Sequence, residues 1–292
     1  MKHLILCTAF LTTAATTLAP TAAAARAQEP SIEFPQASPA STLKQRFGLT
    51  DVEVVYSRPS MKGRKIFGGL VPNGEVWRTG ANAATKITFS TDVGVEGMLV
   101  PAGSYALVTI PGDKEWTVIL NKATGDWGAY AYDQKNDQLR VKVKPIALTE
   151  PVETMTIDVD ELRDATARLT IAWEKTRVPV KLETDLVDVL VPKIKEVMAG
   201  TSDKKPYLQA AMFYYEHDLD LKQALAWIDE GIKKQPDAVW MVYRKGLIQK
   251  KAGDKAGALT TAQASLDMAK KAGGSLGTEY THLSESLIAS LK

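Results

Sequence analysis

The sequence is poor in the side chains on which most metal-binding and catalytic chemistry depends. It has one cysteine, Cys7, and three histidines in 292 residues. A single thiol excludes an internal disulfide, and a zinc site usually needs three or four His or Cys ligands. His217 and His282 stand far apart and outside any metal-ligand motif, and residues 38–183 contain no histidine. We therefore expect no metal and no cofactor.

An excess of charge and the common nucleotide motifs are also missing. Lys and Arg number 36 against 34 Asp and Glu, a net charge of +2. Nucleic-acid binders need a strongly basic footprint, so we expect no nucleic-acid partner. The chain carries no P-loop and no G-x-G-x-x-G. With 45% hydrophobic and 24% charged residues, the composition is that of a globular protein, and its length allows two domains.

Residues 1–27 have the form of a signal peptide. Lys2 gives a positive start, an apolar run extends from Leu4 to Leu11, and Ala25-Arg26-Ala27 has the small-x-small form of a cleavage site. The run is too short to cross a bilayer, and nothing later resembles a membrane span. We expect cleavage after Ala27 and a periplasmic or secreted protein. The alternative is a disordered leader rich in Ala and Thr.

Residues 41–183 follow a period of two, after a proline-rich lead-in at 28–40. Alternation places apolar side chains on one face of a half-buried strand, and Gly and Pro turns separate the series. The pattern predicts about nine short strands in an antiparallel β-sandwich or barrel, which we assign as a jelly-roll-like sandwich. The clearest series are Val52-Val54-Tyr56, Leu139-Val141-Val143, Met155-Ile157-Val159 and Leu169-Ile171-Trp173.

Residues 184–292 follow a helical period. A stripe from Leu186 to Val197 predicts one helix, and further helices are expected at 205–217, 221–234, 238–251, 255–272 and 276–291. Asp220-x-x-x-Ala224-Leu225 is echoed 34 residues later by Asp254-x-x-x-Ala258-Leu259. That is the period of tetratricopeptide repeats, which this region resembles at scattered positions. The alternative is an ordinary helical bundle. The fold class is therefore α+β with two domains.

Two segments of the β region stand out as candidate binding loops. Residues 57–82 are rich in Gly and Pro and hold five basic residues against one acid, with Phe67 and Trp77 among them. Arginine recognises carboxylates and phosphates through a planar fork. Residues 121–132 place Trp127, Tyr130 and Tyr132 beside two glycines, and exposed rings of this kind stack on sugars or partner side chains. Each aromatic residue can equally be buried, and each basic residue simply solvated. The candidate ligand-binding residues are Arg58, Arg64, Trp77, Arg78, Asn82, Trp127 and Tyr130.

Several runs in this region resemble a bacterial exported family known as domain of unknown function 2911. They include Tyr56-Ser57-Arg58-Pro59-Ser60, Ile66-Phe67-Gly68, Trp77-Arg78-Thr79-Gly80-Ala81-Asn82, Pro101-Ala102-Gly103 and Trp127-Gly128-Ala129-Tyr130. The resemblance covers residues 37 to about 180. It implies a β-sandwich-like domain in the bacterial cell envelope, and it implies no activity.

Two functions remain open from the sequence. The first is a non-enzymatic binding or scaffold protein, whose sandwich holds an anionic or glycan ligand and whose helical tail binds a protein. The second is a hydrolase of envelope glycans that uses two carboxylates, for which Glu75, Asp126 and Asp133 are the candidates nearest to aromatic residues. A convergent pair of partly buried acids would favour the hydrolase, and clustered arginine and aromatic side chains would favour binding.

Overall fold

The computed structural model describes residues 34–125 and 127–292, and every strand and helix lies within Ser38–Lys292. The expected signal peptide and its cleavage site lie outside these residues, as does Asp126. Residues 34–39 form no regular element, and β1 begins at Ala40. No helix among the described residues has the length and apolar character to cross a membrane.

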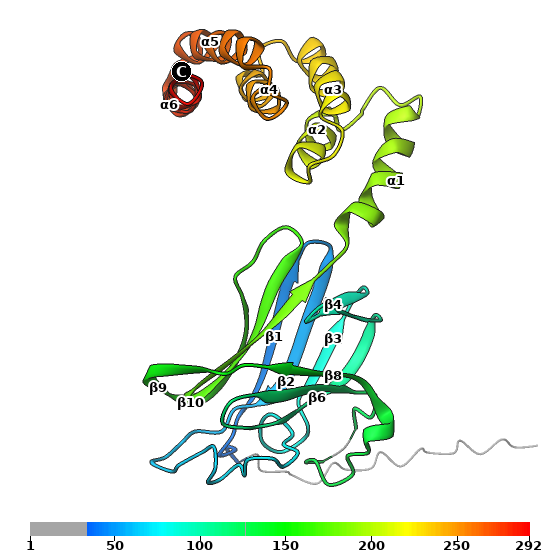
Figure 1. Cartoon of the computed structure of the whole chain (residues 1–292), viewed down its shortest axis with the longest axis vertical. Helices are drawn as coiled ribbons and strands as arrows, with labels where there is room; N and C mark the ends of the chain where they lie inside the picture. Colours follow the sequence, from blue (N-terminus) through cyan, green and yellow to red (C-terminus); the bar gives the residue numbers. More distant parts are fainter. Residues whose placement is uncertain (1–33, 126) are drawn as a thin grey trace, which may run out of the picture. The chain divides into compact units, whose positions relative to one another are not determined.

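The β region is a sandwich of two antiparallel sheets, as the sequence predicts (Figure 1). One sheet has six strands in the order β1-β2-β3-β6-β7-β8, and the other has four in the order β5-β4-β10-β9. A 3-10 turn at Gln134–Asn136 precedes β8. The strands are β1 (Ala40–Phe47), β2 (Thr50–Ser57), β3 (Lys86–Phe89), β4 (Val93–Val95), β5 (Met98–Val100), β6 (Gly103–Ile110), β7 (Trp116–Asn121), β8 (Asp137–Val143), β9 (Ile146–Asp160) and β10 (Thr166–Glu183).

The core between the sheets consists of the residues that the alternation places on one face. All four predicted series are buried, from Val52, Val54 and Tyr56 on β2 to Leu169, Ile171 and Trp173 on β10. Strand β7 departs from alternation because all six of its residues are buried. Its second face is covered by loop residues, among them Val76, Ala84 and Tyr132.

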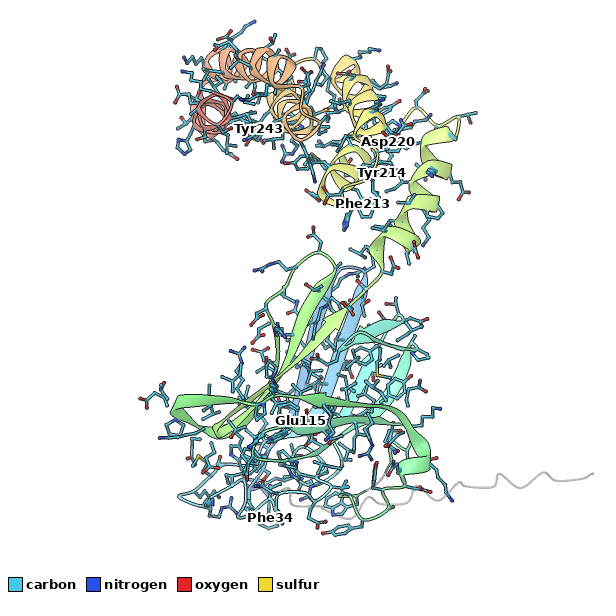
Figure 2. All side chains as sticks on the ribbon, viewed as in Figure 1. Phe34, Glu115, Phe213, Tyr214, Asp220 and Tyr243 are labelled. Carbon is cyan, nitrogen blue, oxygen red and sulfur yellow. The ribbon has the colours of Figure 1, made fainter. Side chains whose placement is uncertain are left out.

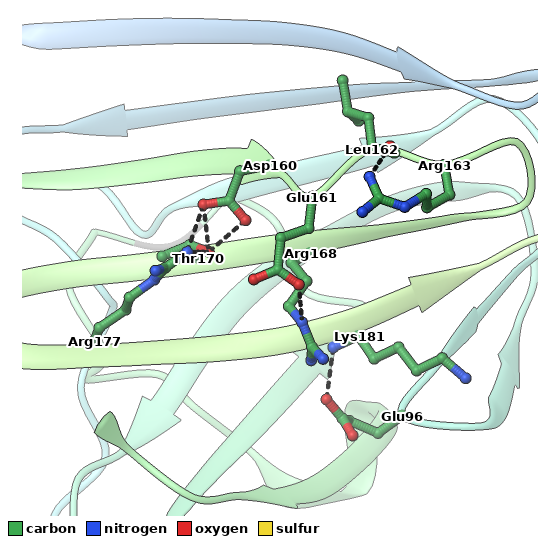
Figure 3. A network of polar contacts seen from close by, with 9 residues as sticks. All are labelled: Glu96, Asp160, Glu161, Leu162, Arg163, Arg168, Thr170, Arg177 and Lys181. Atoms are coloured by element: carbon green, nitrogen blue, oxygen red, sulfur yellow. Dashed lines mark hydrogen bonds and ion pairs between the residues drawn. The ribbon is translucent and has the colours of Figure 1, made fainter. Parts of the chain in front are cut away.

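Strands β9 and β10 are much longer than the short strands expected, with 15 and 18 residues. The pairing between them shifts register on both sides of Glu174, which has a positive φ of 53°. These irregularities break the alternation that marks a strand in the sequence. Beyond them, Arg177 donates to Asp160 at 2.7 Å, and Asp160 also accepts from Thr170 (Figure 3).

The free edge of β9 is partly covered by the segment that follows β2. Met61 N–H donates to the carbonyl of Glu153, and Met155 N–H donates to the carbonyl of Pro59. Ser60 and Thr154 form an isolated bridge between these two bonds. Residues 59–61 therefore act as a short additional strand on the outside of the four-stranded sheet.

Among the described residues six helices follow, each within two residues of its predicted bounds. They are α1 (Leu186–Ala199), α2 (Tyr207–Glu216), α3 (Leu221–Lys234), α4 (Val239–Lys251), α5 (Lys255–Ala272) and α6 (Gly274–Ala289). Asp185, Asp220 and Asp254 cap α1, α3 and α5 by accepting backbone N–H bonds of the first turn, the usual role of Asp at a helix start.

The 34-residue echo corresponds to equivalent positions in the helices. Asp220 and Asp254 each cap a helix, and Ala224 and Ala258 are both fully buried one turn later. Tyr214 packs edge-on against Trp227 at 4.8 Å inside the first unit (Figure 2 labels Tyr214 and Asp220). The two echoed positions therefore play the same parts in α3 and α5, and the resemblance to tetratricopeptide repeats stays a prediction.

Candidate functional site

The two candidate loops meet on the outer face of the six-stranded sheet. Residues 77–85, which we call the 77–85 loop, lie beside β6, and both ends of the loop form backbone hydrogen bonds with that strand. Trp77 and Thr109 exchange backbone bonds of 2.7 and 2.9 Å, and Leu107 N–H donates to the carbonyl of Thr85. The 121–132 loop joins it through Gly128 N–H, which donates to the carbonyl of Asn82 at 3.2 Å. Contact between these segments is invisible in the sequence because it depends on how β6 pairs.

The 77–85 loop is held in a costly backbone conformation. Thr79 has a φ of 53° and Asn82 a φ of 59°, and a β-branched residue seldom adopts such values. Polar bonds compensate: Thr79 bonds the hydroxyl of Thr109, and Thr85 donates to the carbonyl of Thr79 at 2.6 Å. Thr85 N–H also closes the loop onto the carbonyl of Arg78. Strain that the surroundings over-determine is typical of functional segments.

The 121–132 loop is anchored by Tyr132 at its end. The phenol donates to Asp137 at 2.8 Å, and Arg140 bonds both groups. Burial, with the hydrogen bond to Asp137 as a second cause, raises the pKa of Tyr132 to about 12. Asn121 fixes the other end by donating to Asp137 and to the carbonyl of Asp133. The two ends of this loop, at Asn121 and Tyr132, are therefore fixed.

Arg78 is the candidate that the fold leaves available. Its side chain is half-buried, and its Nε–H is fully buried with no hydrogen-bond acceptor among the described residues. Its Nη1 lies against Gly128 of the other loop, 3.4 Å from where a Cβ would stand there. A buried donor without a partner costs about 1–3 kcal/mol, so proteins rarely keep one without a reason.

Tyr130 lies close to Arg78 above Gly128, and Trp127 precedes that glycine in the chain; both rings are open to solvent. Trp127 is 67% exposed and Tyr130 is 88% exposed. The ring edge of Tyr130 lies less than 3 Å from where a Cβ on Gly128 would stand, and the φ of 75° at this position favours glycine. The cavity enclosed below Gly128 has about 10 Å³, room for about one water molecule.

Three other candidates serve the fold. The guanidinium of Arg58 donates to the carbonyl of Met155 at 2.9 Å and to Thr156 at 2.8 Å, so it ties the loop to β9. Arg64 donates to the carbonyls of Ser60 and Met61 within its own turn. The side-chain amide of Asn82 donates to Ser38 and Ser57.

Trp77 belongs to a cluster of four rings in the sandwich core, the buried alternative raised by the sequence. It stacks on Trp173 with centroids 6.0 Å apart, and Phe67 and Trp116 meet it edge-on. Sequence reasoning missed Glu174, whose carboxylate accepts the backbone N–H of Ile66 and Phe67 at 3.2 Å each. Glu174 thereby holds Phe67 in the cluster and fixes the path of the basic loop.

The carboxylates proposed for a hydrolase do not form a pair among the described residues. Glu75 is exposed, and Asp133 is exposed with its carboxylate accepting Lys135 N–H at the start of the 3-10 turn. Asp126 lies outside the described residues. Nor do the described His, Asp and Glu side chains gather in threes around any point that could hold a metal.

Residues 273–277 read G-x-S-x-G, the pattern of a serine hydrolase elbow. Such an elbow joins a strand to a helix. Here the match lies between α5 and α6, two helices, and Ser275 falls in the first turn of α6. The geometry of an elbow is therefore not formed.

Comparison with known proteins agrees with the strand limits. The family model described as "Protein of unknown function (DUF2911)" matches residues 38–182. That range begins two residues before β1 and ends one residue before the end of β10, so it covers the whole sandwich. No curated protein and no solved structure matches the chain. Through its β-sandwich, the chain belongs to the DUF2911 family.

Proposed function

We propose that this protein is an exported, non-enzymatic binding protein of the cell envelope, whose sandwich holds an anionic ligand at Arg78. The observation that carries the proposal is the half-buried guanidinium of Arg78, for which no described residue supplies a hydrogen-bond acceptor. A carboxylate or phosphate would supply the acceptor, and a guanidinium binds either through two parallel bonds.

The surroundings of Arg78 support a binding role over a structural one. Arg58, an equally half-buried arginine of the same segment, donates twice to β9. Arg78 instead belongs to a strained loop, and its Nη1 lies close to Gly128 and to the exposed ring of Tyr130. Aromatic side chains and arginine are the residues that dominate binding surfaces, because they bury much area at a small cost in entropy.

The test is ligand-induced stabilisation of the purified protein against a panel of anionic compounds. A ligand held by Arg78 raises the unfolding temperature of wild type and raises that of Arg78→Lys much less, because lysine lacks the planar fork. Arg64→Lys is the control, since Arg64 serves its own turn. A ligand that stabilises wild type and Arg78→Lys equally does not use this residue.

The proposed location is the periplasm or the exterior, with Ala27 as the last residue removed. Support comes from the leader sequence and its Ala25-Arg26-Ala27 ending. N-terminal sequencing of the protein recovered from the cell envelope fraction tests it. We expect the mature chain to begin at Gln28, and a cytoplasmic protein that retains Met1 would contradict the proposal.

For the helical region we propose a protein partner, supported by its repeated helical hairpins. Surfaces built from such repeats commonly bind other proteins. A groove of about 590 Å³ lies where α2 and α4 begin, with Tyr207, Lys234 and Trp240 in its wall. A photo-crosslinking residue in place of Lys234 should capture a defined partner in cells. The same residue in place of Leu259, an exposed position of α5 outside the groove, is the control.

A further inference from the structure

We propose that the groove at the starts of α2 and α4 takes an acidic segment of a partner protein, with an apolar side chain of that segment packed against Tyr207 and Trp240. This inference rests on the proposed function, because it names the chemistry of the protein partner proposed for the helical region. Three features of the groove carry it: an excess of lysine, the lack of acids at its helix starts, and a largely apolar wall.

The groove is a locally basic site on a nearly neutral protein. It has a volume of about 590 Å³, and its wall includes Lys204, Lys205 and Lys234 against a single acid, Asp203. The local charge is therefore 3 − 1 = +2, whereas the whole chain has 36 basic and 34 acidic residues. Such a concentration of one sign of charge attracts partners of the opposite sign.

Two of these lysines are available to a partner. Lys204 and Lys234 are exposed, and neither forms an ion pair or a side-chain hydrogen bond within the described residues. Lys233, the neighbour of Lys234, instead pairs with Glu230 at 2.6 Å. Lys205 donates to a backbone carbonyl at the end of α1. Carboxylates of a bound segment would therefore find Lys204 and Lys234 unpaired.

The helix starts bring no acid to the groove. Aspartate caps α1, α3 and α5, whereas α2 begins after Pro206 and α4 after Ala238, neither of which offers a side-chain cap. Neither α2 nor α4 has an acid in its first turn. The positive ends of both helix dipoles therefore act in the same sense as the lysines.

The rest of the wall is largely apolar. Tyr207, Leu208 and Trp240 are half-buried there. Gly231 lets α3 approach this wall closely, since Sδ of Met241 and Cβ of Tyr207 each lie 3.2 Å from where a Cβ would stand. Half-buried apolar residues among exposed charges have the layout of a protein interface, with an apolar centre and a polar rim. A flat anionic membrane would reach the exposed lysines but leave the half-buried rings uncovered, so a protein segment fits better.

The experiment measures binding of the whole protein to three rhodamine-labelled peptides. The acidic probe is Glu-Asp-Glu-Phe-Leu-Glu-Asp-Glu. The neutral probe has Gln and Asn in place of the acids, and the polar probe has Ser in place of Phe and Leu. We expect the neutral probe to bind about 2- to 25-fold more weakly than the acidic probe, the scale of two exposed ion pairs. The polar probe should bind about 10-fold more weakly, because it buries no large apolar side chain.

Salt gives an independent measure of the charge contribution. Raising the NaCl concentration from about 50 mM to about 500 mM should slow association of the acidic probe and leave that of the neutral probe nearly unchanged, because salt screens exposed charges.

Charge reversal on the protein tests the same ion pairs. Lys204→Glu and Lys234→Glu should each weaken binding of the acidic probe about 2- to 30-fold, since an attraction becomes a repulsion. Lys271→Glu is the matched control, because Lys271 is also an exposed lysine in the last turn of its helix and lies outside the groove. It should bind the probe as wild type does. Lys234→Gln, which puts no acid at a helix end, should lose about 1.5- to 5-fold. Circular dichroism shows that each variant compared has kept its helices.

A photo-crosslinking residue in place of Gln209 extends the test to cells. Gln209 is an exposed, neutral residue of the groove wall, so all three lysines are kept. We expect the partner segment recovered from this position to contain more Asp and Glu than Lys and Arg.

The outcomes separate this inference from the proposed function. If the neutral probe binds as tightly as the acidic one, or if Lys234→Glu binds it like Lys271→Glu, the segment is not acidic and the inference is wrong. A neutral or basic crosslinked segment also contradicts the inference, but the proposed protein partner stands. If phosphatidylglycerol vesicles bind through Lys234 and the acidic probe does not, the groove contacts a membrane and both proposals fail. Both fail as well if neither Gln209 nor Lys234 captures a partner that Leu259 does not.

Discussion

We expect the same substitution to change the stability of the protein in opposite directions at Arg58 and at Arg78. Both are half-buried arginines of one loop region, but Arg58 donates two hydrogen bonds to β9 and the Nε–H of Arg78 has no acceptor among the described residues. Replacing each with methionine keeps most of the aliphatic stem and removes the charge. Without ligand, the first change breaks structural bonds, and the second removes a polar group that folding leaves unsatisfied.

The expected magnitudes differ in sign. Hydrogen bonds of charged groups are worth about 1.5–3 kcal/mol, and we apply that range once to Arg58 because both bonds come from one guanidinium. Arg58→Met should therefore lower the unfolding temperature by about 3–12 °C, at about 2–4 °C per kcal/mol for a chain of this size. An unsatisfied buried donor costs about 1–3 kcal/mol, so Arg78→Met should leave stability unchanged or raise it by up to that amount.

The assay is thermal and urea unfolding of the full chain in a buffer free of carboxylates and phosphate, which could occupy Arg78. Near-ultraviolet circular dichroism follows the sandwich through its ring cluster, in which Trp77 and Trp173 stack. If Arg78→Met destabilises the protein as much as Arg58→Met does, Arg78 has a structural partner in the native protein. Arg78 would then not be the residue that binds a ligand.

Three further predictions concern the supports of the site and the division of the chain. Glu174→Gln should lower stability by about 1–3 kcal/mol and weaken the near-ultraviolet signal, since the charge that accepts two N–H bonds near Phe67 is lost; an unchanged spectrum would contradict this role. Because burial raises the pKa of Tyr132 to about 12 against about 10 in the unfolded chain, its contribution to stability is complete below pH 10 and disappears as pH rises to 12. Between pH 10 and 12 the free energy of unfolding should decrease less in Tyr132→Phe than in wild type, which urea titrations at several pH values would detect. Some decrease should remain, because three other tyrosines also have raised pKa values. Limited proteolysis should release a stable fragment ending near residues 180–205, and halves that are insoluble when separated would show that the boundary is misplaced.

The regular elements could be predicted from the sequence because local patterns determine them. Alternation at Val52, Val54 and Tyr56 marks a strand with one face in the core, and those residues are buried. The helix starts at Asp220 and Asp254 follow from side chains that cap their own first turn. Such signals need only a few neighbouring residues.

The site could be predicted only in part because it depends on pairing between distant segments. The sequence places Arg58 and Arg78 in one basic loop. It gives no sign of which arginine has hydrogen-bond partners within the protein. The difference lies in β9, whose Met155 and Thr156 accept from Arg58 alone. Glu174 was missed for the same reason, since its carboxylate reaches backbone more than a hundred residues away.

The short strand at residues 59–61 has a consequence for the solubility of the protein. An unpaired sheet edge is a template on which another chain can add a strand, and natural proteins cover or interrupt such edges. Here the bonds of Met61 and Met155 occupy the middle of the β9 edge, and Pro59 offers no N–H to an incoming chain. Residues 59–61, in the same loop region as Arg78, thus prevent another chain from pairing with this part of the β9 edge. Deleting the loop to abolish ligand binding would expose the β9 edge and promote aggregation. A point substitution at Arg78 leaves residues 59–61 paired with β9.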